Sequence, residues 1–146
     1  MEKQTSTQLS NKAFNLASML VLVIGVATYC IGLFNASMQL NEKGYYLVIL
    51  LYGLFSAISL QKSIRDKQEN LSTSAIYHLL SLVSTGSAIV FLLIGLYNAD
   101  LLLSEKGFYG IAYIMSLYAA VAVQKNLRDQ AYHADSEHNT EHLQDA

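Results

Sequence analysis

A chain of 146 residues has room for one compact domain, and its net charge of -2 at pH 7 provides no basic surface for a nucleic acid. The lone cysteine, Cys30, excludes an internal disulfide. Only 14% of the residues are charged, and their confinement to short segments excludes an ordinary soluble helical domain, whose exposed helix faces would carry charges every turn or two.

Four long stretches contain no Asp, Glu, Lys or Arg. Each has at least 18 residues, which is close to the roughly 20 that a helix needs to cross a hydrocarbon layer of about 30 Å. We therefore predict an all-α membrane protein with four transmembrane helices. The predicted spans lie at about residues 14–34, 44–61, 76–97 and 107–124.

The first apolar run follows a polar N-terminal tail at residues 1–12. The run has about 22 residues, whereas the apolar core of a signal peptide has about 7–15, and no small-residue cleavage site follows it. A similar run also occurs at residues 77–97, far inside the chain. We therefore predict that the first run is a retained span.

The chain contains an internal repeat. Residues 31–66 recur at 94–129 without a gap, and 16 of the 36 positions are identical. The repeat divides the chain into a first two-helix unit at 13–66, a linker at 67–75, a second unit at 76–129 and a disordered acidic tail at 130–146.

Small residues recur at the same register in both units. In lipid, helices pack where small side chains let the backbones approach, so these positions predict helix contacts. They are Ser18, Gly25 and Gly32 with Ser81, Ala88 and Gly95, and Gly53 and Ala57 with Ser116 and Ala120.

The repeated EKG motif marks the start of the second helix of each unit. Asn41 and Ser104 precede it and are predicted N-caps, since either side chain accepts from free backbone N–H groups. The glutamates then lie in the first turn, where the helix dipole favours a carboxylate, and the lysines reach the headgroups. An alternative is a ligand site at the outer membrane face, formed by Asn35, Glu42, Lys43, Asn98, Glu105 and Lys106.

Asn35 and Asn98 end the first helix of each unit. We expect them to cap it, in the left-handed conformation or through a local hydrogen bond. Aromatic residues gather at the same level and predict an interfacial belt. They are Phe34, Tyr45 and Tyr46 with Tyr97, Phe108 and Tyr109.

A second repeated motif, QKxxRD, ends each unit. Its cations Lys62, Arg65, Lys125 and Arg128 are predicted cytoplasmic anchors at the membrane surface. On a helix, the lysine and aspartate of each motif form an i,i+4 pair. In the C-terminal tail the spacing of His133, His138 and His142 does not place all three on one helical face, so we predict no metal site.

The distribution of cations predicts the orientation. Seven Lys and Arg residues flank the termini and the central linker, whereas only Lys43 and Lys106 lie at the other ends of the spans. The positive-inside rule then places both termini in the cytoplasm. Because each unit crosses twice, the two units are parallel repeats related by a pseudo-two-fold axis along the membrane normal. Short connections predict two helical hairpins, each with antiparallel neighbours, which together form a bundle.

The paired motifs NAxxxLxEKGxY and QKxxRD, each present twice, resemble those of the bacterial YiaA/YiaB inner-membrane protein family, whose unit is a two-helix domain. The resemblance covers about residues 14–66 and 77–129. It implies a multi-pass protein of the bacterial inner membrane. It implies no substrate, reaction or catalytic residue.

A structural or interaction role in the inner membrane is the function that the sequence favours. Its expected partners are the lipid bilayer and a second copy or another membrane protein, and no nucleic acid. The alternative is a small transporter or channel subunit, although the middle of each span offers Ser, Thr and Tyr but no Asp, Glu, Lys, Arg or His. We predict no enzyme and no cofactor, because the sequence lacks a metal-ligand cluster, a nucleophile–base constellation and a phosphate loop.

Overall fold

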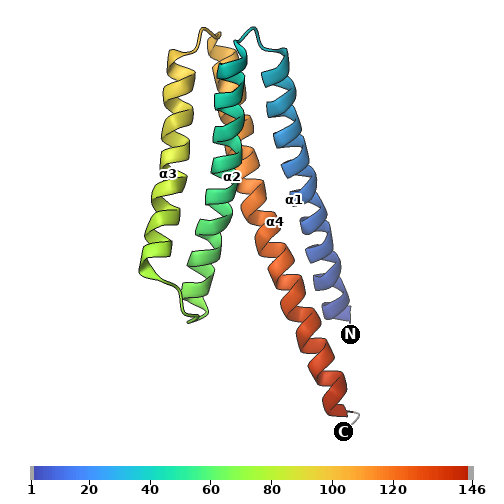
Figure 1. Cartoon of the computed structure of the whole chain (residues 1–146). Coiled ribbons are helices and arrows are strands. Elements are labelled where there is room, and N and C mark those ends of the chain that lie inside the picture. Colours follow the sequence, from blue (N-terminus) through green and yellow to red (C-terminus); the bar gives the residue numbers. More distant parts are fainter. Residues whose placement is uncertain (1, 145–146) are drawn as a thin grey trace.

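The computed structural model describes residues 2–144 and consists of four long helices. They are α1 (Glu2–Asn35), α2 (Leu40–Gln68), α3 (Ala75–Asn98) and α4 (Leu103–Gln144), arranged as an up-and-down bundle (Figure 1). All four are long and apolar enough to cross a membrane. The predicted class, an all-α membrane bundle built from two repeated hairpins, is confirmed.

The helices at the two ends of the chain are longer than predicted. α1 begins at Glu2 and takes in the polar tail. The disordered tail expected at 130–146 is corrected to a helical extension over 130–144, and residues 145–146 lie outside the described residues. Neither segment contains Gly or Pro, so nothing breaks the helix that continues from the adjacent span. Charge and polarity led to the expectation of disorder, although neither prevents a helix.

Helix packing joins the two repeats. α1 packs on α4 and α2 packs on α3, whereas the two helices of each hairpin make few contacts with one another. The expectation that hairpin partners are the close neighbours is therefore corrected. α4 contacts both α1 and α2 and lies between them in Figure 1. The connection at 36–39 therefore holds α1 and α2 together mainly at one end. The α1·α4 and α3·α2 pairs are equivalent under the repeat, as a pseudo-two-fold axis requires.

The predicted small-residue faces form these contacts. A Cβ added to Gly32 of α1 would lie 2.8 Å from the ring of Phe108 in α4. At the equivalent place, a Cβ on Gly95 would lie 2.7 Å from the ring of Tyr45. Both distances are too short for an unshifted side chain, so glycine permits the close approach. The second face is confirmed as well, because Gly53, Ala57, Ser116 and Ala120 are all buried.

Tyrosines dominate the core near the end that carries the two hairpin connections. Tyr46 and Tyr109, which are repeat partners, stack with centroids 6.5 Å apart. Their side chains are 4% and 5% exposed, so the predicted interfacial belt is corrected at these two positions. Tyr29 and Tyr113 are fully buried, and each donates its hydroxyl to a main-chain oxygen of α2 at 3.0 Å.

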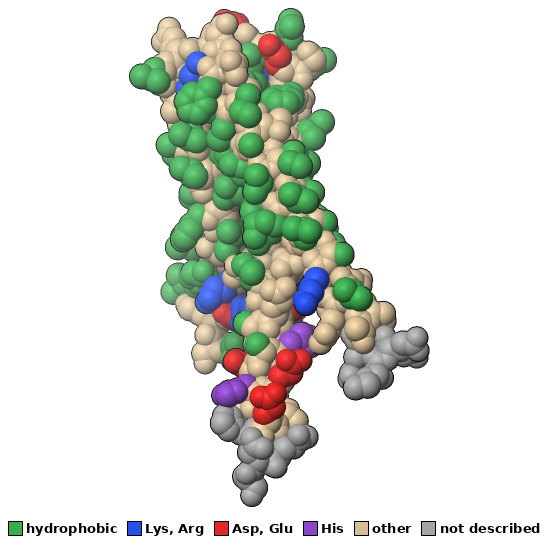
Figure 2. Space-filling view, turned by 90° about the vertical axis from the view of Figure 1, so that its right-hand side faces the viewer, with side chains coloured by type: hydrophobic (Ala, Val, Ile, Leu, Met, Phe, Trp, Pro, Cys, Tyr) green, Lys and Arg blue, Asp and Glu red, His purple; other side chains and the backbone are tan. Residues whose placement is uncertain are grey.

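The surface separates apolar and charged side chains. In Figure 2 hydrophobic side chains cover the middle of the bundle, and charged side chains gather toward its ends. Exposed residues of the middle include Ile24, Phe55, Val83, Ile111 and Tyr118. Such a surface suits a hydrocarbon environment, because these side chains would be expensive to expose to water.

Both described termini lie at one end of the bundle with the connection at 69–74 (Figure 1). The connections at 36–39 and 99–102 lie at the opposite end. We call these the terminal end and the connection end. The arrangement agrees with an even number of spans.

The predicted orientation can be tested with fusions to alkaline phosphatase, which is active only outside the cytoplasm. Fusions after Glu42 or Glu105 are expected to be active, and fusions after Asp66 or at the C-terminus inactive, because the cations flank the terminal end. The reverse pattern of activity would invert the orientation.

Candidate functional site

At the connection end, each glutamate of the EKG motif caps the start of its helix. The Gln39 N–H donates to Glu42 Oε2 at 2.9 Å, and the Leu102 N–H donates to Glu105 Oε2 at 2.8 Å. This is the reach-back contact of a capping box. The predicted N-caps Asn41 and Ser104 are therefore wrong, because α2 begins at Leu40 and α4 at Leu103. The glutamates lie in the first turn, as predicted.

The lysine of each EKG motif binds the end of the preceding helix. Lys43 Nζ donates to the main-chain oxygen of Phe34 at 2.8 Å, and Lys106 Nζ donates to that of Tyr97 at 3.3 Å. A cation at a helix C-terminus satisfies a free carbonyl and interacts favourably with the dipole. The lysines therefore join the two helices of a hairpin, and their reach to the headgroups stays a prediction.

Asn35 and Asn98 bond locally. Each side-chain Nδ2 donates to a main-chain oxygen four residues earlier, that of Ile31 or Ile94, at 2.8 Å. Neither asparagine has positive φ. Of the two expected kinds of cap, the local hydrogen bond is present and the left-handed conformation is not.

The six residues of the predicted outer-face site thus make repeated structural contacts. The structure nevertheless brings residues from the two repeats together around one cavity of about 610 Å³. Glu42 of the first repeat and Asn98 of the second line it. Asn35, Lys43, Glu105 and Lys106 are not part of its lining.

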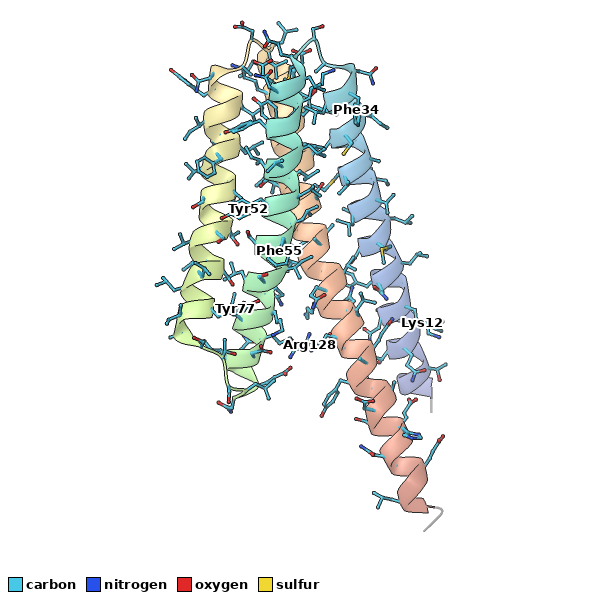
Figure 3. The ribbon with its side chains drawn as sticks, in the orientation of Figure 1. Lys12, Phe34, Tyr52, Phe55, Tyr77 and Arg128 are labelled. Carbon is cyan, nitrogen blue, oxygen red and sulfur yellow. The ribbon has the colours of Figure 1, made fainter. Side chains whose placement is uncertain are left out.

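At the terminal end, the two QKxxRD motifs exchange ion pairs across the bundle. Arg65 of α2 pairs with Asp129 of α4, and Arg128 Nη2 of α4 lies 2.9 Å from Asp66 Oδ1 of α2. The two pairs are repeat equivalents. Glu69 accepts from both arginines, at 3.0 and 3.4 Å. Figure 3 shows Arg128 between α2 and α4.

These contacts change the interpretation of the predicted anchors. Arg65 and Arg128 bind carboxylates of the other repeat. The predicted i,i+4 pair of Lys62 with Asp66 is present at 3.3 Å. Within residues 2–144 the ion-pair partner of Asp129 is Arg65, so the second predicted i,i+4 pair, with Lys125, is corrected. The Arg128 guanidinium, and then Lys62, hold the pKa of Asp66 below its ordinary value, so this carboxylate is ionised at neutral pH.

Sequence reasoning missed the cross-repeat exchange and a second polar contact. Ser63 Oγ of α2 lies 2.9 Å from His78 Nδ1 of α3, and Ser63 is fully buried. Identical RD pairs in two parallel repeats were the available signal for the exchange. Nothing in the sequence alone linked Ser63 to His78.

Comparison with known proteins agrees with this architecture. The family described as "yiaA/B two helix domain" matches residues 9–66 and 77–129, which include most of each of the four candidate spans. The chain belongs to the YiaA/B two-helix domain family. Both matched segments end at the aspartate of a QKxxRD motif, so the ion-pair exchange joins the two copies of the family domain.

Two known membrane proteins are similar to the chain. The chain is 53% identical over 129 residues to the inner membrane protein YiaA of Escherichia coli (strain K12), a match that covers 88% of each chain. It is 39% identical over 59 residues to the uncharacterized membrane protein YubF of Bacillus subtilis (strain 168), which covers 40% of this chain and 68% of YubF. No solved structure matches the chain.

Proposed function

We propose that this YiaA/B family member has a structural or interaction role in the inner membrane, as a closed helical bundle. The supporting observation is the packing of the bundle at mid-depth. Tyr29, Tyr113 and Ser116 are fully buried there, and a Cβ on Gly53 would lie 2.8 Å from the ring of Tyr113 and closer still to its hydroxyl. Such contacts leave little room for a solute between α2 and α4.

The hollows at the two ends of the bundle agree with this role. One is the cavity at the connection end. Another, of about 840 Å³, lies between the polar extensions of α1 and α4, beside Lys12 and Glu137. A conduit for a charged solute usually carries an ionisable group or a broken helix at mid-depth. The four spans are continuous helices whose middle is apolar apart from Ser, Thr and Tyr.

Accessibility of an introduced thiol tests whether the bundle is closed. In a Cys30→Ala background, Ser116→Cys is expected to resist a membrane-impermeant maleimide from both sides of the membrane, because position 116 is fully buried. Ser104→Cys, at the exposed start of α4, is the matched control and is expected to react. Reaction at position 116 from water would favour a transporter or channel subunit and overturn the proposal.

Co-purification tests the interaction role. Extraction in mild detergent after cross-linking in intact membranes is expected to recover the chain with a second copy or another membrane protein in a fixed ratio. Recovery of a single chain with lipid alone would contradict an interaction role. A structural role in the membrane would then be the remaining proposal.

A further inference from the structure

The cavity at the connection end has an acidic and aromatic lining. It lies between the 36–39 connection, the start of α2 and the end of α3, and its volume is about 610 Å³. Its lining includes the carboxylates Glu42 and Asp100 and the rings of Tyr45 and Tyr46, and no Lys, Arg or His. The lysine nearest in sequence, Lys43, is bonded instead to the end of α1.

One side chain of the lining, Tyr46, is buried but leaves its hydroxyl without a hydrogen-bond partner in residues 2–144. The residue is only 4% exposed, but its hydroxyl oxygen is not among the enclosed polar atoms, so it remains accessible. By contrast, the hydroxyls of the buried Tyr29 and Tyr113 are both bonded. Within residues 2–144 the hydroxyl of Tyr109 makes no hydrogen bond either, but Tyr109 is not part of this lining. The hydroxyl of Tyr46 is therefore available to bond a group inside the cavity.

The position of Tyr46 aims this hydroxyl at the cavity. Gly95 of α3 also lines the cavity, and a Cβ added to it would lie 3.2 Å from the Tyr46 hydroxyl. The rings of Tyr45 and Tyr46 meet edge to face, with centroids 5.4 Å apart. One carboxylate oxygen of Glu42 caps α2 through the Gln39 N–H, which fixes the carboxylate at the cavity wall.

Carboxylates, aromatic rings and a hydroxyl are the groups that recognise an ammonium ion. We propose that this cavity binds an organic ammonium group. Glu42 and Asp100 supply the opposite charge, the tyrosine rings contact its apolar carbons, and the Tyr46 hydroxyl accepts an N–H. The group belongs either to a free small amine or to the ethanolamine headgroup of a lipid.

Calorimetric titration tests the proposal. The full chain is placed in nanodiscs of phosphatidylglycerol, which contain no ammonium group, and titrated with propylammonium. Saturable binding is expected. 1-Propanol, a neutral molecule of the same length, is expected to bind at least tenfold more weakly, because the carboxylates provide the recognition. Absence of saturable propylammonium binding, or equal binding of 1-propanol, would overturn the proposal.

The repeat offers a matched pair of variants. Glu42→Gln and Glu105→Gln both keep an oxygen that caps their helix at the same position, but only Glu42 lines the cavity. Glu42→Gln is expected to weaken propylammonium binding at least tenfold, and Glu105→Gln less than twofold. Tyr46→Phe is expected to weaken it at least threefold, through loss of the hydroxyl. Equal effects of the two glutamate variants would overturn the assignment.

A second arm identifies the source of the ammonium group. Including phosphatidylethanolamine in the nanodiscs is expected to weaken propylammonium binding if the headgroup occupies the cavity. Unchanged affinity would support a free amine as the ligand. Both outcomes are consistent with an ammonium site. Competition between phosphatidylethanolamine and propylammonium distinguishes a lipid headgroup from a free amine.

Discussion

Replacing Gly53 with alanine is expected to destabilise the bundle by about 2 kcal/mol, because the new methyl group overpacks a filled interface. The added Cβ would lie 2.8 Å from Tyr113 Cζ and closer to its hydroxyl, and Tyr113 is fully buried and bonded to the main-chain oxygen of Ile49. The loss of stability from this clash is larger than the gain of about 1 kcal/mol that alanine has over glycine in a helix interior. Reversible unfolding in mixed micelles measures the difference in free energy.

Gly44→Ala is the matched control in the same helix. A Cβ at Gly44 would have no neighbour within 4 Å, so this substitution is expected to be neutral or slightly stabilising. Combining Gly53→Ala with Tyr113→Phe removes the hydroxyl from the clash, and the pair is expected to cost less than the sum of the two changes. Additive costs would show that Gly53 and Tyr113 do not compete for the same space.

The membrane spans and their contact faces were predictable because they rest on local and repeated patterns. A stretch of 18 or more apolar residues without charges is enough to predict a membrane span. Gly25 and Gly32, and Ala88 and Gly95 in the second repeat, appear at a seven-residue spacing that identifies one face of each helix. What the pattern did not contain was the identity of the helix that each face meets.

The partner helix was predicted wrongly because chain connectivity favoured the hairpin. A connection such as 36–39 requires α1 and α2 to be close at one end only, and long helices then diverge to the partners that fit best. The large, fully buried side chains illustrate the fit. Tyr29 of α1 and Tyr113 of α4 meet with ring centroids 6.1 Å apart, whereas their repeat partners, Leu92 of α3 and Leu50 of α2, are smaller and also buried.

The N-caps were predicted wrongly for a different reason. Asn41 and Ser104 have favourable cap chemistry, but Glu42 and Glu105 act as N3 residues and place the helix start two residues earlier, after Gln39 and Leu102. Gln and Leu are weak N-caps by propensity. The bond from the N-cap backbone N–H to the N3 glutamate therefore has more influence on where these helices begin than the side chain of the N-cap residue.

The candidate site was predictable only as a list of motif residues. The sequence placed Glu42 and Asn98 at one membrane level, and the structure adds that they share a cavity with Tyr46 and Asp100. Tyr46 was assigned to the interfacial belt because a tyrosine at a helix start is common there. Its burial depends on the stacking with Tyr109, a contact between residues 63 positions apart in the chain.

Reversing the charge of Arg128 is expected to open the terminal end of the bundle. In Arg128→Asp the new carboxylate faces Asp66 and Glu69, which now accept from the guanidinium, and like charges at this distance repel. The midpoint of thermal unfolding in detergent is expected to fall by at least about 5 °C. The decrease should become smaller at high salt, because these side chains are partly exposed and their repulsion is screened.

The second reversal, Asp66→Arg, tests whether the pairing itself is responsible. In the double variant an attractive pair forms in the opposite sense, so the midpoint is expected to recover at least half of the loss, although the contact between Lys62 and Asp66 is not restored. Arg128→Asp with Lys62→Asp is the control, because it adds no cation opposite position 128 and should not recover. Equal midpoints for the two double variants would show that Arg128 and Asp66 do not hold the repeats together. Recovery only in Arg128→Asp with Asp66→Arg would show that the QKxxRD motif forms a contact between the repeats. Its arginines would then not be free to act as membrane anchors.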